Sequence, residues 1–204
     1  DWLAMLRDYR KAELSRVFPK RPGSVFPGTA IRRLGAKLDE DAVVCVDVGQ
    51  NQIFTCKYFP QKHGRLLTSG GLGTMGYALP AAIGVKVAKP DRQTVVVCGD
   101  GSFQMAMNEL AAIRCADLDI KILVFQNHTL GLVHQIQKSL PYHGPFGVDL
   151  DGSPDFAAIA AAYGIPSIMV REEEELDEAI ERFLSTKGAC LMLCEVHPDV
   201  GTND

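Results

Sequence analysis

Residues 94–132 read TVVVCGDGSFQMAMNELAAIRCADLDIKILVFQNHTLGL, and they carry the clearest indication of the fold. Two apolar runs rich in β-branched residues, 94–98 and 120–125, predict buried strands, and residues 108–115 between them have helical spacing. The stretch therefore predicts a strand–helix–strand unit with a polar motif after each strand. In an open parallel sheet, ligands bind at the edge where the strands end, so both motifs are candidates for one binding site.

The two polar motifs contain a candidate metal-binding pair. Asp100 follows the first strand and Asn127 follows the second, at a separation of about one βαβ unit. A right-handed crossover brings the ends of the two strands side by side. A carboxylate and an amide oxygen can then share one hard cation, and Mg²⁺ bridging to phosphate groups is the commonest use of such a pair. The alternative interpretation is that Asp100 only caps the helix that follows it.

The alternation of strand-like runs and amphipathic segments continues through the chain. Further strands are predicted at 42–47, 165–170 and 189–196, and helices at 29–38, 79–88, 154–163 and 172–184, with another helix beginning at Ile53 and with Ser153 capping the helix at 154–163. This pattern predicts an α/β fold, a doubly wound parallel sheet of about six strands with helices on both faces.

The length of 204 residues suffices for one domain with a sizeable core. We expect residues 1–23 to form a linker or N-terminal amphipathic helix, and residues 24–204 to form the domain. Because the chain begins at Asp1 rather than at a methionine, we expect a fragment of a longer enzyme or a separate subunit of one.

Composition narrows the function classes. A net charge of −4 offers no basic surface for nucleic acid, and the apolar stretches are too short to cross a membrane. The N-terminus has no signal-peptide pattern, and the six cysteines lack the spacing and the histidine partners of a zinc site. We therefore expect a cytoplasmic protein whose cysteines are buried, reduced thiols.

Two glycine-containing turns complete the candidate site. Gly49 allows a tight turn after the first predicted strand, and the next N–H groups, at Gln50 and Asn51, can face an anion. The alternative is a turn that only leads into the helix predicted from Ile53. Residues 68–76 hold four glycines, which permit close approach of the backbone to a ligand.

These motifs, in this order, resemble the thiamine diphosphate (ThDP) enzymes and, within them, the acetolactate (acetohydroxyacid) synthases. Gly99-Asp100-Gly101 matches the family signature outright, whereas Gln126-Asn127 matches only at its second position, since an Asn pair is usual there. Segments 47–52, 68–84 and 130–135 resemble the acetolactate synthase branch. The family usually has His where Asn51 stands. The resemblance covers roughly residues 24–198.

The resemblance implies a C-terminal, diphosphate-binding domain that anchors Mg²⁺ and ThDP. It implies that Asp100, Asn127 and the backbone carbonyl of Thr129 bind the metal. The implied cofactor-binding residues are Gln50, Asn51, Gly73, Thr74, Met75, Asp100, Gly101, Ser102, Asn127, Thr129, Leu130, Gly131 and Leu132. In the family, the carbonyl at Gly73 accepts a hydrogen bond from the aminopyrimidine, and the side chain at Met75 wedges between the two rings of a bent cofactor. The alternative for Met75 is simple core packing.

The implied reaction decarboxylates pyruvate and condenses the enamine with a second 2-keto acid, as in branched-chain amino acid biosynthesis. In the family, a Glu on an N-terminal pyrimidine-binding domain activates the cofactor across a dimer interface, and no segment here corresponds to that domain. We therefore expect no catalytic residue within this chain, little activity from it alone, and a homodimer or tetramer for the complete enzyme. FAD is a candidate further cofactor of that enzyme.

Other interpretations remain open. The chain could belong to another ThDP-dependent 2-keto acid decarboxylase or carboligase, or be a non-catalytic scaffold domain. A Rossmann-type nucleotide site is disfavoured because Gly71-Leu72-Gly73 does not continue into the full glycine pattern.

His128 and His134 invite a catalytic interpretation, and the alternative is a surface or supporting role. Ile136 stands where many acetolactate synthases have Trp, which predicts weaker discrimination between pyruvate and 2-ketobutyrate as acceptor.

Overall fold

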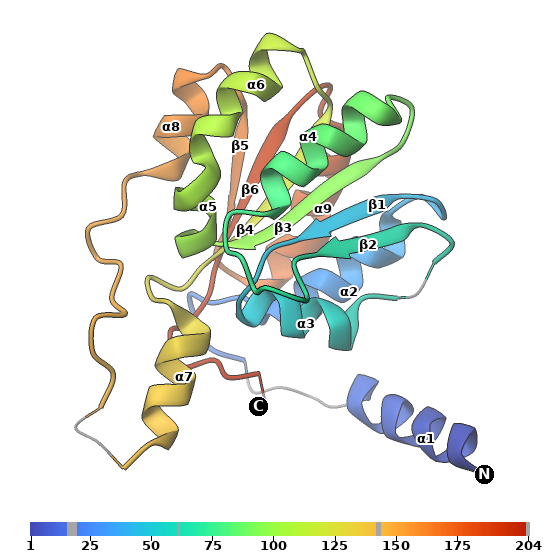
Figure 1. The fold of residues 1–204 in the computed structure, drawn as a ribbon, viewed down its shortest axis with the longest axis vertical. Helices are drawn as coiled ribbons and strands as arrows, with labels where there is room; N and C mark the ends of the chain where they lie inside the picture. Colours follow the sequence, from blue (N-terminus) through green and yellow to red (C-terminus); the bar gives the residue numbers. More distant parts are fainter. Residues whose placement is uncertain (16–19, 61, 142–143, 203–204) are drawn as a thin grey trace.

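The structure is a computed structural model that describes residues 1–15, 20–60, 62–141 and 144–202. Within these residues, six strands form one parallel sheet in the order β2-β1-β3-β4-β6-β5, and helices cover both of its faces (Figure 1). The predicted α/β class, the parallel sheet and its six strands are confirmed.

The bounds of the elements follow the predicted alternation closely. The strands are β1 Val43–Val46, β2 Arg65–Thr68, β3 Thr94–Gly99, β4 Ile120–Gln126, β5 Ser167–Val170 and β6 Cys190–Glu195. The α-helices are α1 Trp2–Leu14, α2 Pro27–Lys37, α3 Gln50–Tyr58, α4 Ala78–Ala88, α5 Asp100–Ala106, α6 Leu110–Cys115, α7 Gly131–Ser139, α8 Phe156–Ala162 and α9 Leu176–Ser185, and two short 3₁₀ helices are η1 Met107–Glu109 and η2 Glu173–Glu175.

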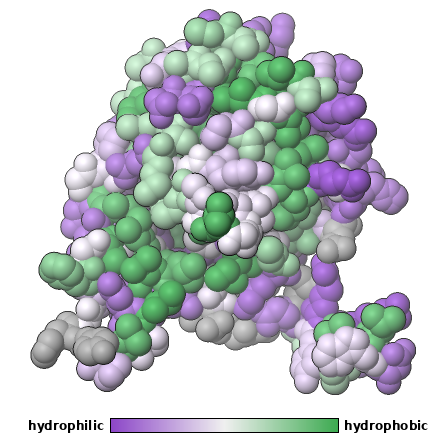
Figure 2. Space-filling view, viewed as in Figure 1, coloured by the Kyte–Doolittle hydropathy of each residue, from purple (hydrophilic) through white to green (hydrophobic). Residues whose placement is uncertain are grey.

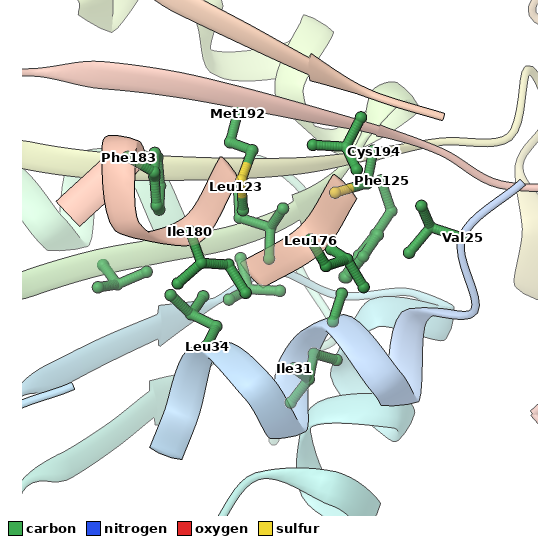
Figure 3. Close-up of a cluster of buried hydrophobic side chains, with 14 of the residues drawn as sticks. Val25, Ile31, Leu34, Leu123, Phe125, Leu176, Ile180, Phe183, Met192 and Cys194 are labelled. Atoms are coloured by element: carbon green, nitrogen blue, oxygen red, sulfur yellow. The ribbon is translucent and has the colours of Figure 1, made fainter. Parts of the chain in front are cut away.

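The sheet is covered on both faces because alternate residues of each strand point to opposite sides. In β3, Val95 and Val97 face one apolar layer, whereas Val96 and Cys98 face the other. Figure 3 shows the first layer, where side chains of α2 and α9 meet those of β4 and β6. On the opposite face α5 and α8 pack together. Fully burying one such side chain contributes about 1.5–3 kcal/mol, so the two layers hold the sheet edge rigidly in place.

The order of the strands creates one crevice beside β1. The chain passes from β1 to β2 on one side and then returns to place β3 on the other side of β1. Register pairs Val46 with Val97, and Gly99 with Phe125, so β1, β3 and β4 end close together. Ligands bind at such switch points in open α/β sheets.

Several predicted boundaries were wrong for identifiable reasons. The edge strand β2 was missed because its residues are partly exposed and form no apolar run. The helix predicted at 108–115 is broken into α5, η1 and α6, and it begins already at Asp100. Asp155, not Ser153, caps α8, since its carboxylate accepts the N–H of Ala158 at 3.0 Å.

The start of α3 and the cysteines also differ from expectation. The helix begins at Gln50 rather than Ile53, because Gly49 has a φ of +140° that lets the chain turn directly into it. The six cysteines are free, but only four of them are buried. Cys56 and Cys115 are exposed because they lie on the outer faces of helices, so the expectation of buried thiols is wrong for these two.

The N-terminal helix α1 exposes its apolar side chains, with Trp2 and Tyr9 each 66% exposed. Near its end, Glu13 accepts a hydrogen bond from the Tyr58 hydroxyl at 2.8 Å, which connects it to α3. The predicted division at residues 1–23 and 24–204 stays a prediction, and Phe18, which we assigned to the N-terminal amphipathic segment, lies outside the described residues. None of the described helices has the length and hydropathy to span a membrane.

Candidate functional site

A cavity of about 280 Å³ lies at the carboxyl ends of β1, β3 and β4. All of the predicted cofactor-binding residues except Thr74 line it. The lining comprises Pro27, Val48, Gly49, Gln50, Asn51, Phe54, Gly73, Met75, Gly99, Asp100, Gly101, Ser102, Phe125, Asn127, Thr129, Leu130, Gly131, Leu132, Val133 and Val196. The fold thus brings together motifs that lie far apart in the sequence, and their roles toward a ligand stay predictions.

Asp100 is the buried carboxylate of this cavity, at 2% exposure. It is the first residue of α5, directly after β3, and Oδ1 accepts the Gly101 N–H at 2.8 Å. Its Oδ2 accepts the N–H groups of Asn127 at 3.0 Å and His128 at 2.7 Å. Burial raises the pKa of the Asp100 carboxyl to about 6, although these N–H donors lower it. Asp100 therefore fixes the loop after β4 and still presents a desolvated acid to the cavity.

The loop after β4 is shaped by Asp100 and by a short bridge to the segment after α7. His128 has a φ of +56°, an unusual conformation for a residue other than glycine. Thr129 forms an antiparallel bridge with Asp149, and its hydroxyl donates to the Val148 carbonyl at 3.0 Å. Asn127 Oδ1 accepts the Thr129 N–H at 3.3 Å. These contacts hold the amide oxygen of Asn127 in a defined position beside Asp100.

The turn after β1 places two amide side chains in the cavity. Asn51 Nδ2 donates to the Asp47 carbonyl at 2.6 Å, so this amide nitrogen is already engaged by the backbone. Gln50 Nε2 donates to Gln135 and to the Val200 carbonyl. At the start of α3, however, the first N–H groups have no acceptor within the helix and can face an anion. The backbone of Gln50 and Asn51, more than their side chains, is thus suited to bind phosphate oxygens.

The glycine-rich loop is tied to the sheet by Asp47, a residue for which the sequence analysis predicted no role. Asp47 follows β1, is 1% exposed, and accepts N–H groups from Val48, Gly76 and Ala78 at 2.9–3.0 Å. Burial raises the pKa of the Asp47 carboxyl. Asp47 therefore holds the loop that places Gly73 and Met75 in the cavity. The only signal for it in the sequence was a polar residue directly after a buried strand.

The remaining predicted residues fall into three situations. Ser102 turns its hydroxyl to Gly99, donating to its carbonyl and accepting its N–H, both at 3.1 Å. Thr74 is exposed, and its N–H donates to Ser69 Oγ at 3.1 Å. Leu130 and Leu132 are partly buried at the mouth of the cavity. The Ser102 hydroxyl is thus engaged by the backbone although Ser102 lines the cavity, and Thr74 lies outside the lining.

Neither histidine of the predicted pair lines the cavity. His128 Nε2 lies 2.9 Å from Glu195 Oε1, at the end of β6. His134 lies with Gln135 and Ile136 along a second cavity, between α7 and the C-terminal segment 198–201. Within the described ranges, no group of three or more His, Cys, Asp or Glu side chains is placed to hold a metal ion. A cation at Asp100 would therefore need amide, carbonyl and ligand oxygens as well.

The space around two glycines shows how tightly the cavity is built. A Cβ at Gly101 would lie 2.7 Å from Leu130 Cδ2, and a Cβ at Gly131 would lie 2.2 Å from Gln50 Oε1 and 2.5 Å from Asn127 Nδ2. Only residues without a side chain fit at these two positions. The cavity lining thus combines bare backbone at these two glycines with one carboxylate and three carboxamides, which is the chemistry that an anionic ligand with a divalent cation requires.

Comparison with known proteins agrees with this geometry. The family model of the thiamine pyrophosphate enzyme C-terminal TPP-binding domain matches residues 47–194. The chain belongs to this family. The match begins at Asp47, which holds the glycine-rich loop, and ends within β6, so it includes all residues that line the cavity except Pro27 and Val196.

Curated relatives of this TPP-binding domain are acetolactate synthases. The mitochondrial catalytic subunit of Saccharomyces cerevisiae is 36% identical over 98% of this chain and 30% of its own length. Isozyme 1 large subunit of Escherichia coli is 35% identical over 94% of the chain and 34% of its length. An acetolactate synthase of Arthrospira platensis is 39% identical over 78% and 28%. The chain thus spans about a third of the length of these relatives.

Proposed function

We propose that this chain is the Mg²⁺- and ThDP-binding domain of an acetolactate-synthase-like enzyme, which decarboxylates pyruvate and joins the remaining two-carbon unit to a second 2-keto acid. The observation that carries the proposal is the meeting of Asp100 and Asn127 at one cavity, at the ends of neighbouring strands. The similarity to acetolactate synthases supports the choice of reaction.

The metal would be held by Asp100, by Asn127 Oδ1 and by the Thr129 carbonyl, with diphosphate oxygens completing the coordination. A carboxylate offers about four lone-pair sites, and Asp100 uses three of them for backbone N–H groups. One site remains for a cation. A desolvated carboxylate at this position costs free energy that a bound cation would offset, which is the physical reason to expect Mg²⁺ there.

The organic cofactor fits the remaining features of the cavity. The start of α3 lines the cavity, and its first N–H groups, which have no acceptor within the helix, would bind the diphosphate. Met75 lines the cavity, and its Cε lies 3.5 Å from where a Cβ at Gly101 would stand, so its flexible thioether is placed to contact an aromatic ring there. Leu130 and Leu132 exclude water from the same region. ThDP, when bound, supplies the carbanion chemistry, and these residues orient it and keep its surroundings dry.

Further parts of the complete enzyme belong to the proposal. The activating Glu would come from a pyrimidine-binding domain in a homodimer or tetramer. Such a partner would cover apolar residues that are exposed in this chain. Leu72 is 93% exposed and Phe146 is 88% exposed, and Figure 2 shows hydrophobic surface over α7 and the middle of this face. Use of FAD, a role in branched-chain amino acid synthesis and a cytoplasmic location stay predictions.

Calorimetry of the full-length protein tests this function. We expect ThDP to bind in the presence of Mg²⁺ and to lose most of its affinity when EDTA is added, whereas NAD should not bind. Incubation with pyruvate should then yield acetolactate. A product such as acetaldehyde alone would instead indicate another ThDP-dependent 2-keto acid decarboxylase, and absence of Mg²⁺-dependent ThDP binding would contradict the proposal.

A further inference from the structure

An unbroken series of hydrogen bonds joins the C-terminal segment to Asn127. The Thr202 N–H donates to Gln135 Oε1 at 2.9 Å, and Gln50 Nε2 donates to the same oxygen at 3.0 Å. Gln50 Nε2 also donates to the Val200 carbonyl at 2.9 Å. Gln50 Oε1 accepts from Asn127 Nδ2 at 3.3 Å. The series therefore begins at two backbone groups beyond β6 and ends at the amide of the candidate metal ligand.

The two backbone groups determine which way every carboxamide in the series is turned. A main-chain carbonyl only accepts and a main-chain N–H only donates, whereas a carboxamide can do either at each end. Because the Val200 carbonyl can only accept, it bonds to the Gln50 amino group, and the Gln50 oxygen then faces Asn127. Asn127 must then present its amino group to Gln50. Its oxygen is left on the other side, where it accepts the Thr129 N–H at 3.3 Å and keeps a lone pair for a cation.

Most of the series is buried, although Gln135 is only partly buried and lines the second cavity, so reversing an amide within the series would be costly. Gln50, Asn127 and Thr202 are each less than 10% exposed, and a reversed amide would set two donors or two acceptors against each other. The segment itself is anchored at both ends. Lys57 Nζ donates to the Thr202 carbonyl at 2.6 Å, and Lys138 pairs with Asp199.

We propose that Gln135 and segment 200–202 are positioning elements of the metal site, which act through Gln50 to keep the Asn127 oxygen turned toward the cation. The inference rests on the proposed function, because it assumes that Asn127 binds Mg²⁺. It adds a dependence of metal affinity on residues that touch neither the metal nor the cofactor.

The test compares two replacements of Gln135 in the full-length protein. Gln135→Met has a similar size but accepts no hydrogen bond from Gln50 or Thr202, whereas Gln135→Glu still accepts both. The measurement is the Mg²⁺ dissociation constant at saturating ThDP, by calorimetry. We expect it to rise about tenfold in Gln135→Met, as is typical when a group supporting a metal ligand is lost, and to stay within about twofold in Gln135→Glu.

A packing role for Gln135 would give equal losses in the two variants or a larger loss in Gln135→Glu, since an ionised Glu at this partly buried position disturbs packing at least as much as Met. The matched control is Gln137→Met on the same helix, whose amide bonds to the Phe146 backbone instead and which should bind Mg²⁺ normally. Thr202→Pro removes the N–H donor at the start of the series and should weaken Mg²⁺ binding, while Thr202→Ser retains both that N–H and the hydroxyl that accepts from Gln135 Nε2 at 3.0 Å, and should not.

Three outcomes would overturn the inference. Equal Mg²⁺ affinity in wild type, Gln135→Met and Thr202→Pro would show that the series does not act on the metal site, even if ThDP and Mg²⁺ bind. Equal weakening by Gln135→Met and Gln135→Glu would show a packing role alone. Absence of Mg²⁺-dependent ThDP binding in the wild type would remove the proposed function and this inference together.

Discussion

Asp47 and Asp100 lie just beyond the neighbouring strands β1 and β3, and each is almost completely buried. Each carboxylate accepts three backbone N–H groups, and burial raises the pKa of both. They differ in what lies beside them. Asp100 lines the cavity, whereas Asp47 is enclosed between β1 and the glycine-rich loop. Burial and hydrogen bonding alone therefore do not identify a binding carboxylate, and the cavity decides.

The largest expected difference between the two residues is in metal dependence. Asp100→Asn removes the carboxylate charge proposed for the metal, so Mg²⁺-dependent ThDP affinity should fall at least a thousandfold, about 4 kcal/mol. Asp47→Asn only loosens the glycine-rich loop, and should lower ThDP affinity about tenfold while binding still requires Mg²⁺. Calorimetry with and without EDTA distinguishes the two. Equal losses of ThDP affinity in both variants would contradict the assignment of different roles to the two carboxylates.

The next prediction concerns pH. The Asp100 pKa is about 6 in the folded protein and about 3.9 in an unfolded chain. Between these values the folded state keeps a proton that the unfolded state has lost, so this group makes stability fall as pH rises from about 4 to 6. The total fall is about 3 kcal/mol, and the contribution is level outside that window.

This effect is isolated by subtraction. Urea unfolding of the cofactor-free protein at pH 4, 5, 6 and 7 gives the free energy of unfolding for wild type and for Asp100→Asn. The wild-type value minus the variant value should decrease with pH over this range, because Asp47 is present in both proteins and its contribution cancels. A difference that stays level from pH 4 to pH 7 would mean that Asp100 titrates like a solvent-exposed acid.

A third prediction concerns the space at Gly131, beside the amides of Gln50 and Asn127. A Cβ at Gly131 would collide with Gln50 Oε1 and Asn127 Nδ2, so Gly131→Ala should displace both amides and weaken Mg²⁺ binding about tenfold. Gly71→Ala is the matched control in the glycine-rich loop, since a Cβ there meets nothing within 4 Å. If the two variants bind Mg²⁺ equally well, the amide pair does not depend on the bare backbone at Gly131.

The sequence predicted the place of Asp100 in the site far better than the role of Asp47. Asp100 and Asn127 follow long apolar runs, and parallel pairing of such runs brings their ends together whatever the surrounding loops do. Asp47 accepts hydrogen bonds from the backbone N–H groups of Gly76 and Ala78, about thirty residues later. Because every residue except proline has such a group, these contacts cannot be predicted from the residue types. The contacts of Gln135 with Gln50 and Thr202 span still longer separations and depend on how the C-terminal segment packs.

Boundaries failed where the local signal was weak. The edge strand β2 contains Arg65 and Thr68 around two leucines, a pattern that fits a loop as well as an exposed strand. The break between α5 and α6 at η1 has no Gly or Pro to mark it. In both cases pairing or packing with distant elements decides the structure, so no window of neighbouring residues could show it.

The smallest expected effect lies on α7, which begins directly after the loop that Asp100 holds. Ile136 is 52% exposed and lines the second cavity rather than the one that contains Asp100. Its side chain would therefore meet a substrate only at the outer rim of the site. Ile136→Trp enlarges the apolar surface there, and we expect it to shift acceptor choice between pyruvate and 2-ketobutyrate by about fivefold, near 1 kcal/mol, at the low end for one apolar contact.

A competition assay with both acceptors on the full-length enzyme measures this shift as a product ratio. Leu140→Trp is the matched control, because Leu140 is similarly exposed, at 44%, but lines neither of these two cavities. The loop that Asp100 fixes also sets the direction of α7. A changed product ratio in Ile136→Trp but not in Leu140→Trp would therefore show that this loop affects acceptor choice as well as metal binding. An unchanged ratio would confine that influence to cofactor binding and leave Ile136 as a residue of the outer surface.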